Sequence, residues 1–324
     1  MRFARLAALM WCVTVAVERP CGGVAHATGR ALVFTKTAGF RHDSIPSGLA
    51  MLQELRSTAN LEIEATEDAE SFTPETLSTY DAVVWLNTTG DVLTPSQQDA
   101  FRAYVEAGGG YVGIHSAADT EHDWAWYGEL LGGGAWFRSH PAIQAAELVV
   151  EDMGHSSTAH LASRFPFTDE WYNFQRNPRA AVTVLLAIDE TTYDPGPDRM
   201  GDHPIAWYHE IGDGRAWYTN LGHRDETYAD EAFRRHVLGG LLWAAGCDPD
   251  CVQTPTPSPL PTPAACVGDC DENGIVAVDE LVRAVTIALG TTPPQACPAA
   301  DSEGDGLVTV SGLVQAVVAA LQGC

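Results

Sequence analysis

The sequence predicts a doubly wound α/β domain with a mostly parallel sheet and a β extension, followed by a small helical module with calcium-type loops. Apolar runs alternate with helical segments through the first three quarters of the 324 residues, as in a parallel sheet that helices cover on both faces. After a proline-rich stretch, two acidic loops each lead into an apolar helix. The hydrophobic content of 45% is sufficient for a globular core.

Four apolar runs, three of them nearly continuous, are predicted as parallel strands at residues 31–38, 61–65, 81–87 and 111–117. Helices are expected between them, at 47–55 and 94–108. The second helix begins with Thr94 as N-cap, Pro95 at the first helical position and Gln97 as capping-box partner. The β extension is predicted from runs at 146–152, 181–188, 204–210 and 215–221, and a closing helix follows at 231–246.

The amino-terminal segment has the features of a secretory signal. Arg2 and Arg5 precede an apolar run at 6–17, and Ala25-His26-Ala27 has the small-x-small form of a cleavage site. We therefore expect residues 1–27 to be removed and the protein to be secreted, to an extracellular, cell-surface or periplasmic location. The alternative is a buried N-terminal strand or helix. No later stretch is apolar for long enough to predict a transmembrane segment.

The charge balance excludes one class of partner. The chain has 18 Lys and Arg against 43 Asp and Glu, a formal net charge of -25, which would repel a phosphate backbone. Nucleic-acid binding is not expected.

Composition divides the rest of the chain. A Pro/Thr-rich linker at 249–265 separates a large domain, residues 28–248, from a tail at 266–324. Outside the signal, all six cysteines lie in the last quarter: Cys247, Cys251, Cys266, Cys270, Cys297 and Cys324. In an exported protein these predict disulfides, whose pairing the sequence leaves open. A structural zinc site is the weaker alternative, because the tail has no C-x-x-C pair or histidine.

Three histidines follow predicted strands of the large domain. Ligands of such sheets bind outside the carboxyl ends of the strands, so His42, His115 and His223 are expected at one edge. With Asp119 they are the candidate catalytic residues, His115 being the candidate acid–base. The alternative is that each histidine only satisfies loop backbone groups. A divalent metal bound by these histidines would need ligands distant in sequence, because no HExxH motif is present.

Four further residues are candidates for substrate binding: Arg41, Trp124, Glu170 and His203. Glu170 could also orient or titrate against one of the three histidines. Aromatic residues crowd the stretches after the fourth strand, and such rings suit the apolar faces of sugars, although they also serve as core packing. The aromatic residues alone thus leave two alternatives open, stacking on a saccharide or sugar derivative and packing in a core or lid.

Several blocks, in order, resemble the ThuA-like (trehalose utilisation) domain over residues 30–246: ALVFTKTAGFRH, DAVVWLN, AYVEAGGGYVGIHSAADT, DEWYNF, HPIAWYHEIGDGRAWYTNLGHRDETY and FRRHVLGGLLWAAG. The resemblance implies a fold similar to class I glutamine amidotransferases, which is flavodoxin-like, and a role in carbohydrate metabolism. In those enzymes a nucleophilic cysteine occupies a G-x-C-x-G turn, and His115 stands at that position here. No cysteine lies between Cys21 and Cys247, so Cys-dependent amidotransferase chemistry is excluded for this domain.

The tail contains a calcium-loop motif, D-x-[DN]-x-[DN]-G-x5-E, beginning at Asp269. The predicted calcium ligands are Asp269, Asp271, Asn273, the carbonyl of Ile275 and Glu280. A second loop begins 32 residues later, with candidate ligands Asp301, Glu303, Asp305 and Leu307. Its twelfth position is Gly312, which lacks the bidentate carboxylate, so we expect the second site to be weaker.

Residues 266–324 resemble a dockerin-type, EF-hand-like module, which implies Ca2+ binding and a cohesin-like protein partner. The cysteines and Gly312 depart from the usual pattern, and a calcium- and disulfide-stabilised cap explains the same residues. Two hypotheses for the whole chain remain. One is an exported protein that acts on a sugar or sugar derivative, and the other is a non-catalytic carbohydrate-binding or scaffold protein anchored through its tail.

Overall fold

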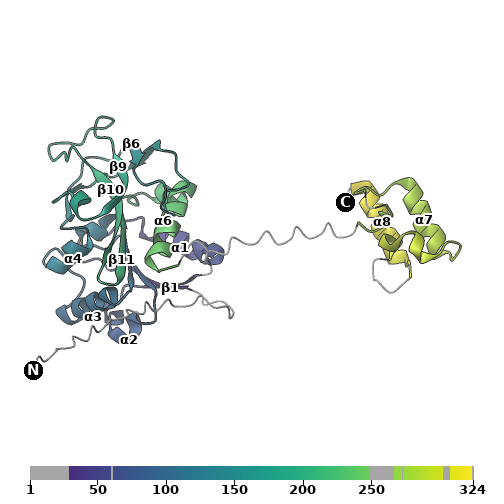
Figure 1. Ribbon diagram of the computed structural model, residues 1–324, viewed down its shortest axis with the longest axis horizontal. Coiled ribbons are helices and arrows are strands. Elements are labelled where there is room, and N and C mark those ends of the chain that lie inside the picture. Colours follow the sequence, from purple (N-terminus) through teal and green to yellow (C-terminus); the bar gives the residue numbers. More distant parts are fainter. Residues whose placement is uncertain (1–28, 60, 248–265, 272, 302–306, 323–324) are drawn as a thin grey trace, which may run out of the picture. The chain divides into compact units, whose positions relative to one another are not determined.

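The computed structural model describes residues 29–247, 266–301 and 307–322, except residues 60 and 272. The chain divides into two compact units at a boundary after Val252 (Figure 1). The predicted signal segment 1–27 and the linker 249–265 lie outside the described residues.

One half of the sheet in the large domain is parallel. Its strands are β1 (Gly29–Phe34), β2 (Leu61–Thr66), β3 (Ala82–Leu86), β4 (Gly110–Ile114) and β11 (Gly214–Thr219). They lie in the order β2-β1-β3-β4-β11, and every neighbouring pair is parallel. This order confirms the predicted doubly wound arrangement, and it places the carboxyl ends of β1, β3, β4 and β11 at one edge.

The other half of the same nine-stranded sheet is antiparallel. It continues from β11 through β10 (Pro204–Ile211), β9 (Thr183–Ile188), β6 (Gln144–Val150) and β7 (Arg164–Asp169). These strands form the predicted β extension, except that the sequence analysis did not predict β7. A separate two-stranded sheet pairs β5 (Phe137–Ser139) with β8 (Asn173–Phe174), and it was also not predicted.

Helices cover both faces of the sheet. Ala31 and Val33 of β1 pack into a core with α1 (Ile45–Ala59) and α6 (Glu231–Ala244), whereas Leu32 and Phe34 face α3 (Pro95–Glu106) and α4 (Ala125–Leu130). This alternation is the period of two expected of a strand buried on both faces. The predicted capping residue Gln97 accepts a hydrogen bond from the Thr94 N–H (2.9 Å).

Short elements connect these layers. The helices are α2 (Pro74–Leu77) and α5 (Asp225–Ala229), and the 3-10 turns are η1 (Ala69–Ser71), η2 (His115–Asp119) and η3 (Pro178–Ala180). The strand predicted at 111–117 therefore ends three residues earlier than expected. His115 adopts φ 50°, which breaks the extended chain and starts η2.

The tail contains the two predicted helices, α7 (Val278–Ala288) and α8 (Val310–Gln322), and two turns, η5 (Pro294–Ala296) and η6 (Pro298–Ala300). A small core of Ala284, Ile287, Cys297 and Ala300 joins them. A disulfide links Cys270 to Cys297. Among the described residues, no helix has the length and apolarity needed to cross a membrane.

A buried histidine makes the stability of the large domain depend on pH. His236 of α6 donates from Nδ1 to the Ser157 carbonyl (2.9 Å), and its Nε2 lies 3.3 Å from the Thr219 hydroxyl. Burial lowers the pKa of His236 to about 3. Below pH 6.5 the unfolded chain therefore binds a proton that the folded chain does not, and stability falls as the pH falls.

We predict that His236→Gln removes part of this acid sensitivity. Between pH 7 and pH 5 the wild type should lose about 2 kcal/mol through this residue, and the variant should not. Urea unfolding followed by tryptophan fluorescence measures the large domain alone, because the tail has no tryptophan. An identical pH-dependent loss in wild type and variant would contradict the prediction.

Candidate functional site

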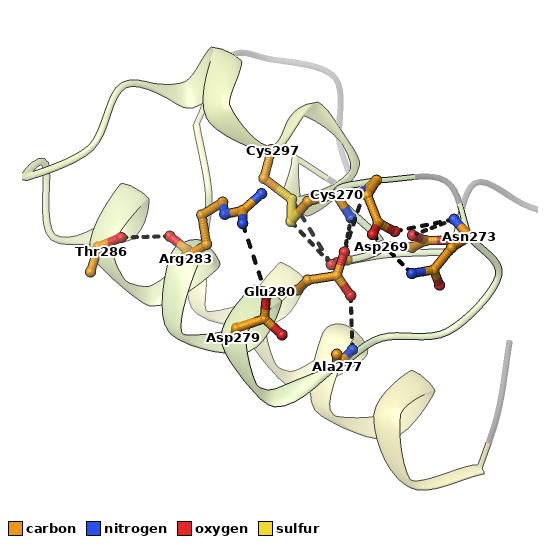
Figure 2. Close-up of a disulfide and its surroundings, with 11 residues drawn as sticks. Asp269, Cys270, Asn273, Ala277, Asp279, Glu280, Arg283, Thr286 and Cys297 are labelled. Atoms are coloured by element: carbon orange, nitrogen blue, oxygen red, sulfur yellow. Dashed lines mark hydrogen bonds and ion pairs between the residues drawn. A yellow bond between two sulfur atoms is a disulfide. The ribbon is translucent and has the colours of Figure 1, made fainter.

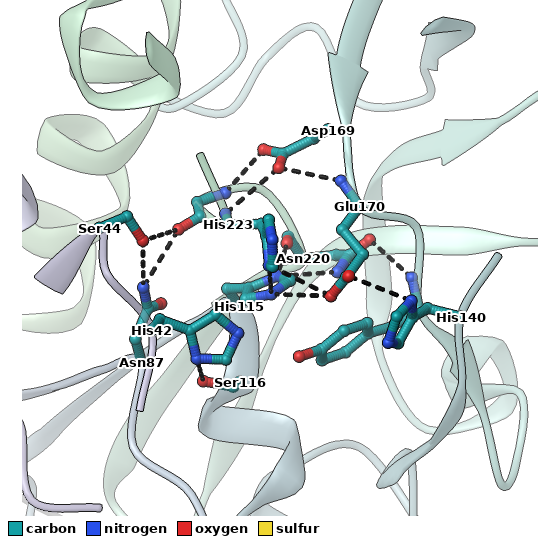
Figure 3. Close-up of polar contacts among 12 residues, drawn as sticks. His42, Ser44, Asn87, His115, Ser116, His140, Asp169, Glu170, Asn220 and His223 are labelled. Carbon is teal, nitrogen blue, oxygen red and sulfur yellow. Dashed lines mark hydrogen bonds and ion pairs between the residues drawn. The ribbon is translucent and has the colours of Figure 1, made fainter. Parts of the chain in front are cut away.

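Three histidines and one glutamate from four separate segments converge in the large domain. His42 lies in the loop after β1, His115 follows β4, His223 follows β11 and Glu170 follows β7. Each offers one nitrogen or oxygen atom, and these four atoms lie within 4.8 Å of one another. Figure 3 shows the side chains pointing toward a common centre. We refer to these four residues as the histidine cluster.

The backbone orients His115 within the histidine cluster. Its left-handed φ of 50° turns the chain sharply out of β4, and its side chain is fully buried. Nδ1 lies 2.7 Å from the carbonyl oxygen of Asn220, which can only accept a hydrogen bond. The Nδ1–H is therefore the donor, and Nε2 faces His223 Nδ1 (3.2 Å) and Glu170 Oε2 (3.5 Å).

Glu170 connects the histidine cluster to a fourth histidine. Its Oε2 lies 3.2 Å from His223 Nδ1, and its Oε1 lies 3.0 Å from Nδ1 of His140. Burial alone would raise the pKa of Glu170. Hydrogen bonds with His115 and His223, and the charges those rings can carry, outweigh burial and hold its pKa below the ordinary value. Glu170 is therefore a carboxylate at neutral pH.

The histidines differ in their electrostatic state. Burial, reinforced by the neighbouring His115 and His223, lowers the pKa of His42 to about 3, so this ring is neutral at physiological pH. Burial also acts to lower the pKa of His223, but its hydrogen bond with Glu170 and the charge of that carboxylate raise it overall. His42 can thus offer a lone pair, while His223 shares a proton with Glu170.

A buried aspartate holds two segments of this site together. Asp169, the last residue of β7, is fully buried, and burial raises its pKa. Its carboxylate accepts four hydrogen bonds, from the backbone N–H groups of Glu170, Gly222 and His223 and from the hydroxyl of Thr227. Asp169 therefore fixes the positions of the backbone N–H groups of Glu170 and His223.

The carbonyl of Gly222 is held from the other side. Asn87, which follows β3, donates from Nδ2 to the Gly222 carbonyl (3.1 Å), and the hydroxyl groups of Ser44 and Tyr228 donate to the same oxygen. Because that carbonyl can only accept, the amide nitrogen of Asn87 must face it. The amide oxygen is thereby turned away. It is buried, and no group among the described residues donates to it.

The other predicted site residues lie outside the histidine cluster. Arg41 is exposed and pairs with Glu67 (2.6 Å). Asp119 pairs with His122 (2.8 Å) at the end of η2. The ring of Trp124 packs beside that of Trp126, with 5.0 Å between centroids.

His203 is buried apart from the histidine cluster. Its Nδ1 lies 3.0 Å from Glu190 and its Nε2 donates to the carbonyl of Tyr172 (2.8 Å). Glu190 also accepts from the backbone N–H groups of Met200 and Gly201. These contacts hold the loop between Glu190 and His203 in place.

Sequence reasoning missed four residues that support the site: His140, Asp169, Asn87 and Asn220. Asp169 had a signal, because it directly precedes Glu170 in the block DEWYNF. Asn87 and Asn220 also had one, since each follows a strand whose carboxyl end lies at the site edge. His140 follows the unpredicted strand β5, so nothing in the sequence connected it with Glu170.

In the tail, the first predicted calcium loop brings its acidic residues together. Carboxylate oxygens of Asp269, Asp271 and Glu280 lie within 4.8 Å of one another. Glu280 accepts from the backbone N–H groups of Cys270 (2.7 Å) and Ala277 (2.8 Å), as Figure 2 shows. Carboxylates are the ligands Ca2+ prefers, and calcium binding stays a prediction.

The remaining predicted ligands of both loops are only partly described. Asn273 donates from Nδ2 to Asp271 (2.9 Å), and the side chain of Ile275, whose carbonyl is the predicted ligand, is exposed. In the second loop Asp301 and Leu307 are described, whereas Glu303 and Asp305 lie outside the described residues. The disulfide of Cys270 attaches the first loop to the segment that precedes the second.

We predict that calorimetric titration of the full chain with Ca2+ shows one tight binding event. Glu280→Gln should weaken it at least tenfold, because a carboxylate that can bind the ion through both oxygens is lost. Asp279→Asn is the matched control. Its carboxylate is adjacent in sequence but pairs with Arg283 (4.0 Å), and calcium affinity should be unchanged. An isotherm that Glu280→Gln leaves unaltered would disprove the assignment of the loop.

Comparisons with known proteins agree with this architecture. The family model described as ThuA, trehalose utilisation, matches residues 30–244. A ThuA-like protein from Bacteroides uniformis ATCC 8492 is 26% identical with a TM-score of 0.60, covering 71% of this chain and 97% of that one. One from Parabacteroides merdae ATCC 43184 shares the fold at 21% identity and a TM-score of 0.56, covering 67% and 89%. No curated protein matches the chain. The chain therefore belongs to the ThuA, or trehalose utilisation, family.

Proposed function

We propose that this chain is an exported protein that acts on a sugar or sugar derivative through the histidine cluster, with a tail that binds calcium. Membership of the trehalose utilisation family supports a carbohydrate ligand. One observation carries the proposal. His42, His115, His223 and Glu170 converge at the edge of the sheet where ligands of doubly wound folds bind.

The side chains around the histidine cluster suit proton transfer on a hydroxyl-rich ligand. Glu170 links two histidines of different exposure, His115 with a fully buried side chain and His140 with a side chain that is 41% exposed. A carboxylate between two imidazoles can pass a proton from a bound hydroxyl toward solvent. No cysteine lies in the large domain before Cys247, so the reaction does not use a thiolate in the manner of amidotransferases.

The sheet edge beside the histidine cluster also offers an apolar surface. The ring of Phe40 is 67% exposed and stands edge-on to His42, with 4.9 Å between the ring centroids. Aromatic rings next to hydrogen-bonding groups suit the apolar faces of sugar rings. In this proposal a saccharide packs against Phe40 and places one hydroxyl group near the histidine cluster.

The tail has a separate role in the proposal. Its acidic loop and its disulfide hold the segments before α7 and near η6 together, which suits a compact calcium-stabilised module. A cohesin-like protein is the proposed partner if the dockerin resemblance extends to function. The non-catalytic alternative for the whole chain, sugar binding without turnover, is an outcome of the test below.

We predict that the mature chain, residues 28–324, binds or converts trehalose or an oxidised derivative of it, as measured by calorimetry and by NMR of the sugar. His115→Ala should reduce binding or turnover at least tenfold, while the melting temperature changes by only a few degrees. His122→Ala, which changes a histidine outside the histidine cluster, is the control. Turnover that His115→Ala abolishes would identify an enzyme, and binding without turnover would favour the non-catalytic alternative.

The proposal fails if neither sugar is bound or converted by the wild type. It fails equally if His115→Ala matches the wild type in both measurements. If tryptophan fluorescence shows that the large domain of His115→Ala does not fold, His223→Gln replaces it. His223 lies at the more exposed side of the histidine cluster.

A further inference from the structure

We propose that the histidine cluster is a binding site for one divalent transition metal ion of the zinc class, with His42, His115, His223 and Glu170 as its protein ligands. This inference concerns the same residues as the proposed function but does not depend on sugar binding.

The donor set selects a class of metal. Three imidazoles and one carboxylate are ligands typical of Zn2+ and of neighbouring ions such as Fe2+, Co2+ and Ni2+. Mg2+ and Ca2+ prefer sets made only of oxygen atoms. The carboxylate loop of the tail, with Asp269, Asp271 and Glu280, has such an oxygen set. The histidine cluster and the carboxylate loop of the tail should therefore bind different metal ions.

The spacing of the donor atoms matches a tetrahedral ion. Two ligands bound at about 2.0–2.1 Å in a tetrahedron lie about 3.3 Å apart. The distances here are 3.2 Å from His223 Nδ1 to His115 Nε2, 3.2 Å from His223 Nδ1 to Glu170 Oε2, and 3.5 Å from His115 Nε2 to Glu170 Oε2. Three of the six distances between the four donor atoms thus already match those between the ligands of a tetrahedral ion.

The rings are also arranged as ligands of one ion. Three imidazoles bound tetrahedrally would have ring centroids about 5 Å apart. The centroids of His42, His115 and His223 are separated by 4.9, 5.1 and 5.1 Å, and the ring planes cross at 71° to 90°. The three rings therefore meet edge to face around a common point, and none is stacked on another.

Groups behind the ligands fix which atom of each ligand faces the centre. The Asn220 carbonyl accepts from His115 Nδ1, so Nε2 is free to bind a cation. The hydroxyl of Ser116 lies 3.3 Å from Nδ1 of His42, which leaves Nε2 for the ion. His140 contacts the outer oxygen of Glu170, and Asp169 anchors the backbone of Glu170 and His223. Metal sites characteristically have such a supporting layer.

A nearby unpaired acceptor points to a further ligand of the ion. The amide oxygen of Asn87 is buried and no described group donates to it, while its amide nitrogen donates to the carbonyl of Gly222, the residue before His223. An unpaired buried acceptor is unfavourable. A water molecule or a substrate hydroxyl that joined the four protein ligands as a fifth would supply the missing donor. The ion would polarise that oxygen, which is the chemistry such a metal provides when bound.

The test is the metal content of the full chain, purified without a histidine tag and dialysed after exposure to Zn2+. Mass spectrometry should find about one zinc ion per chain, and replacement by Co2+ should give the visible absorption of a low-coordinate cobalt site. Glu170→Gln and His115→Ala should each weaken Zn2+ binding at least tenfold, because each removes one ligand of four. Glu170→Gln changes only one atom, so it serves if His115→Ala does not fold.

Two matched variants separate this site from other metal-binding groups. Both variants should retain the zinc. They are His122→Gln, which changes a histidine outside the histidine cluster, and Glu280→Gln, which changes a residue of the tail. The inference is overturned if the wild type holds less than about a tenth of an ion per chain, or if the two ligand variants bind as much as the wild type. Zinc bound without sugar recognition would reject the proposed function alone, and sugar recognition without zinc would reject this inference alone.

Discussion

The carboxylate of Asp169 is the constraint on which the site depends. It is buried at the end of the outermost strand of the sheet, and its four hydrogen bonds fix the backbone of Glu170 on one side and of Gly222 and His223 on the other. A buried carboxyl group is tolerated only when it is hydrogen-bonded, and the segment after β11 supplies three of the donors in this conformation. The ligand atoms of Glu170 and His223 are held together as a result.

The change from parallel to antiparallel pairing at β11 makes this contact available. A purely parallel sheet would contribute only loops that follow parallel strands, and here these bring His42, His115 and His223. The antiparallel extension from β10 to β7 adds Asp169 and Glu170. The carboxylates of the site thus come from the half of the sheet that departs from the doubly wound pattern.

A buried histidine occupies the sharp turn at which the chain leaves β4. The strained backbone of His115 costs energy that the surrounding contacts must offset. These include the hydrogen bond to the Asn220 carbonyl and the ring of Tyr172, whose centroid lies 4.3 Å from that of His115. Such strain is common at functional sites. The turn therefore presents the side chain of His115 to the histidine cluster.

Local sequence determined the strands of the parallel half, the capped helix α3, and the histidines at the carboxyl ends of strands. It did so because apolar periodicity, capping and strand ends are properties of short segments. The family and the calcium motif were also readable, since several residues match in register. Only the tertiary structure decided that Glu170 joins the three histidines and that His203 lies elsewhere. The position of Glu170 depends on the hydrogen bond from the Gly222 N–H, which follows β11, to Asp169 at the end of β7, a contact between residues more than fifty positions apart.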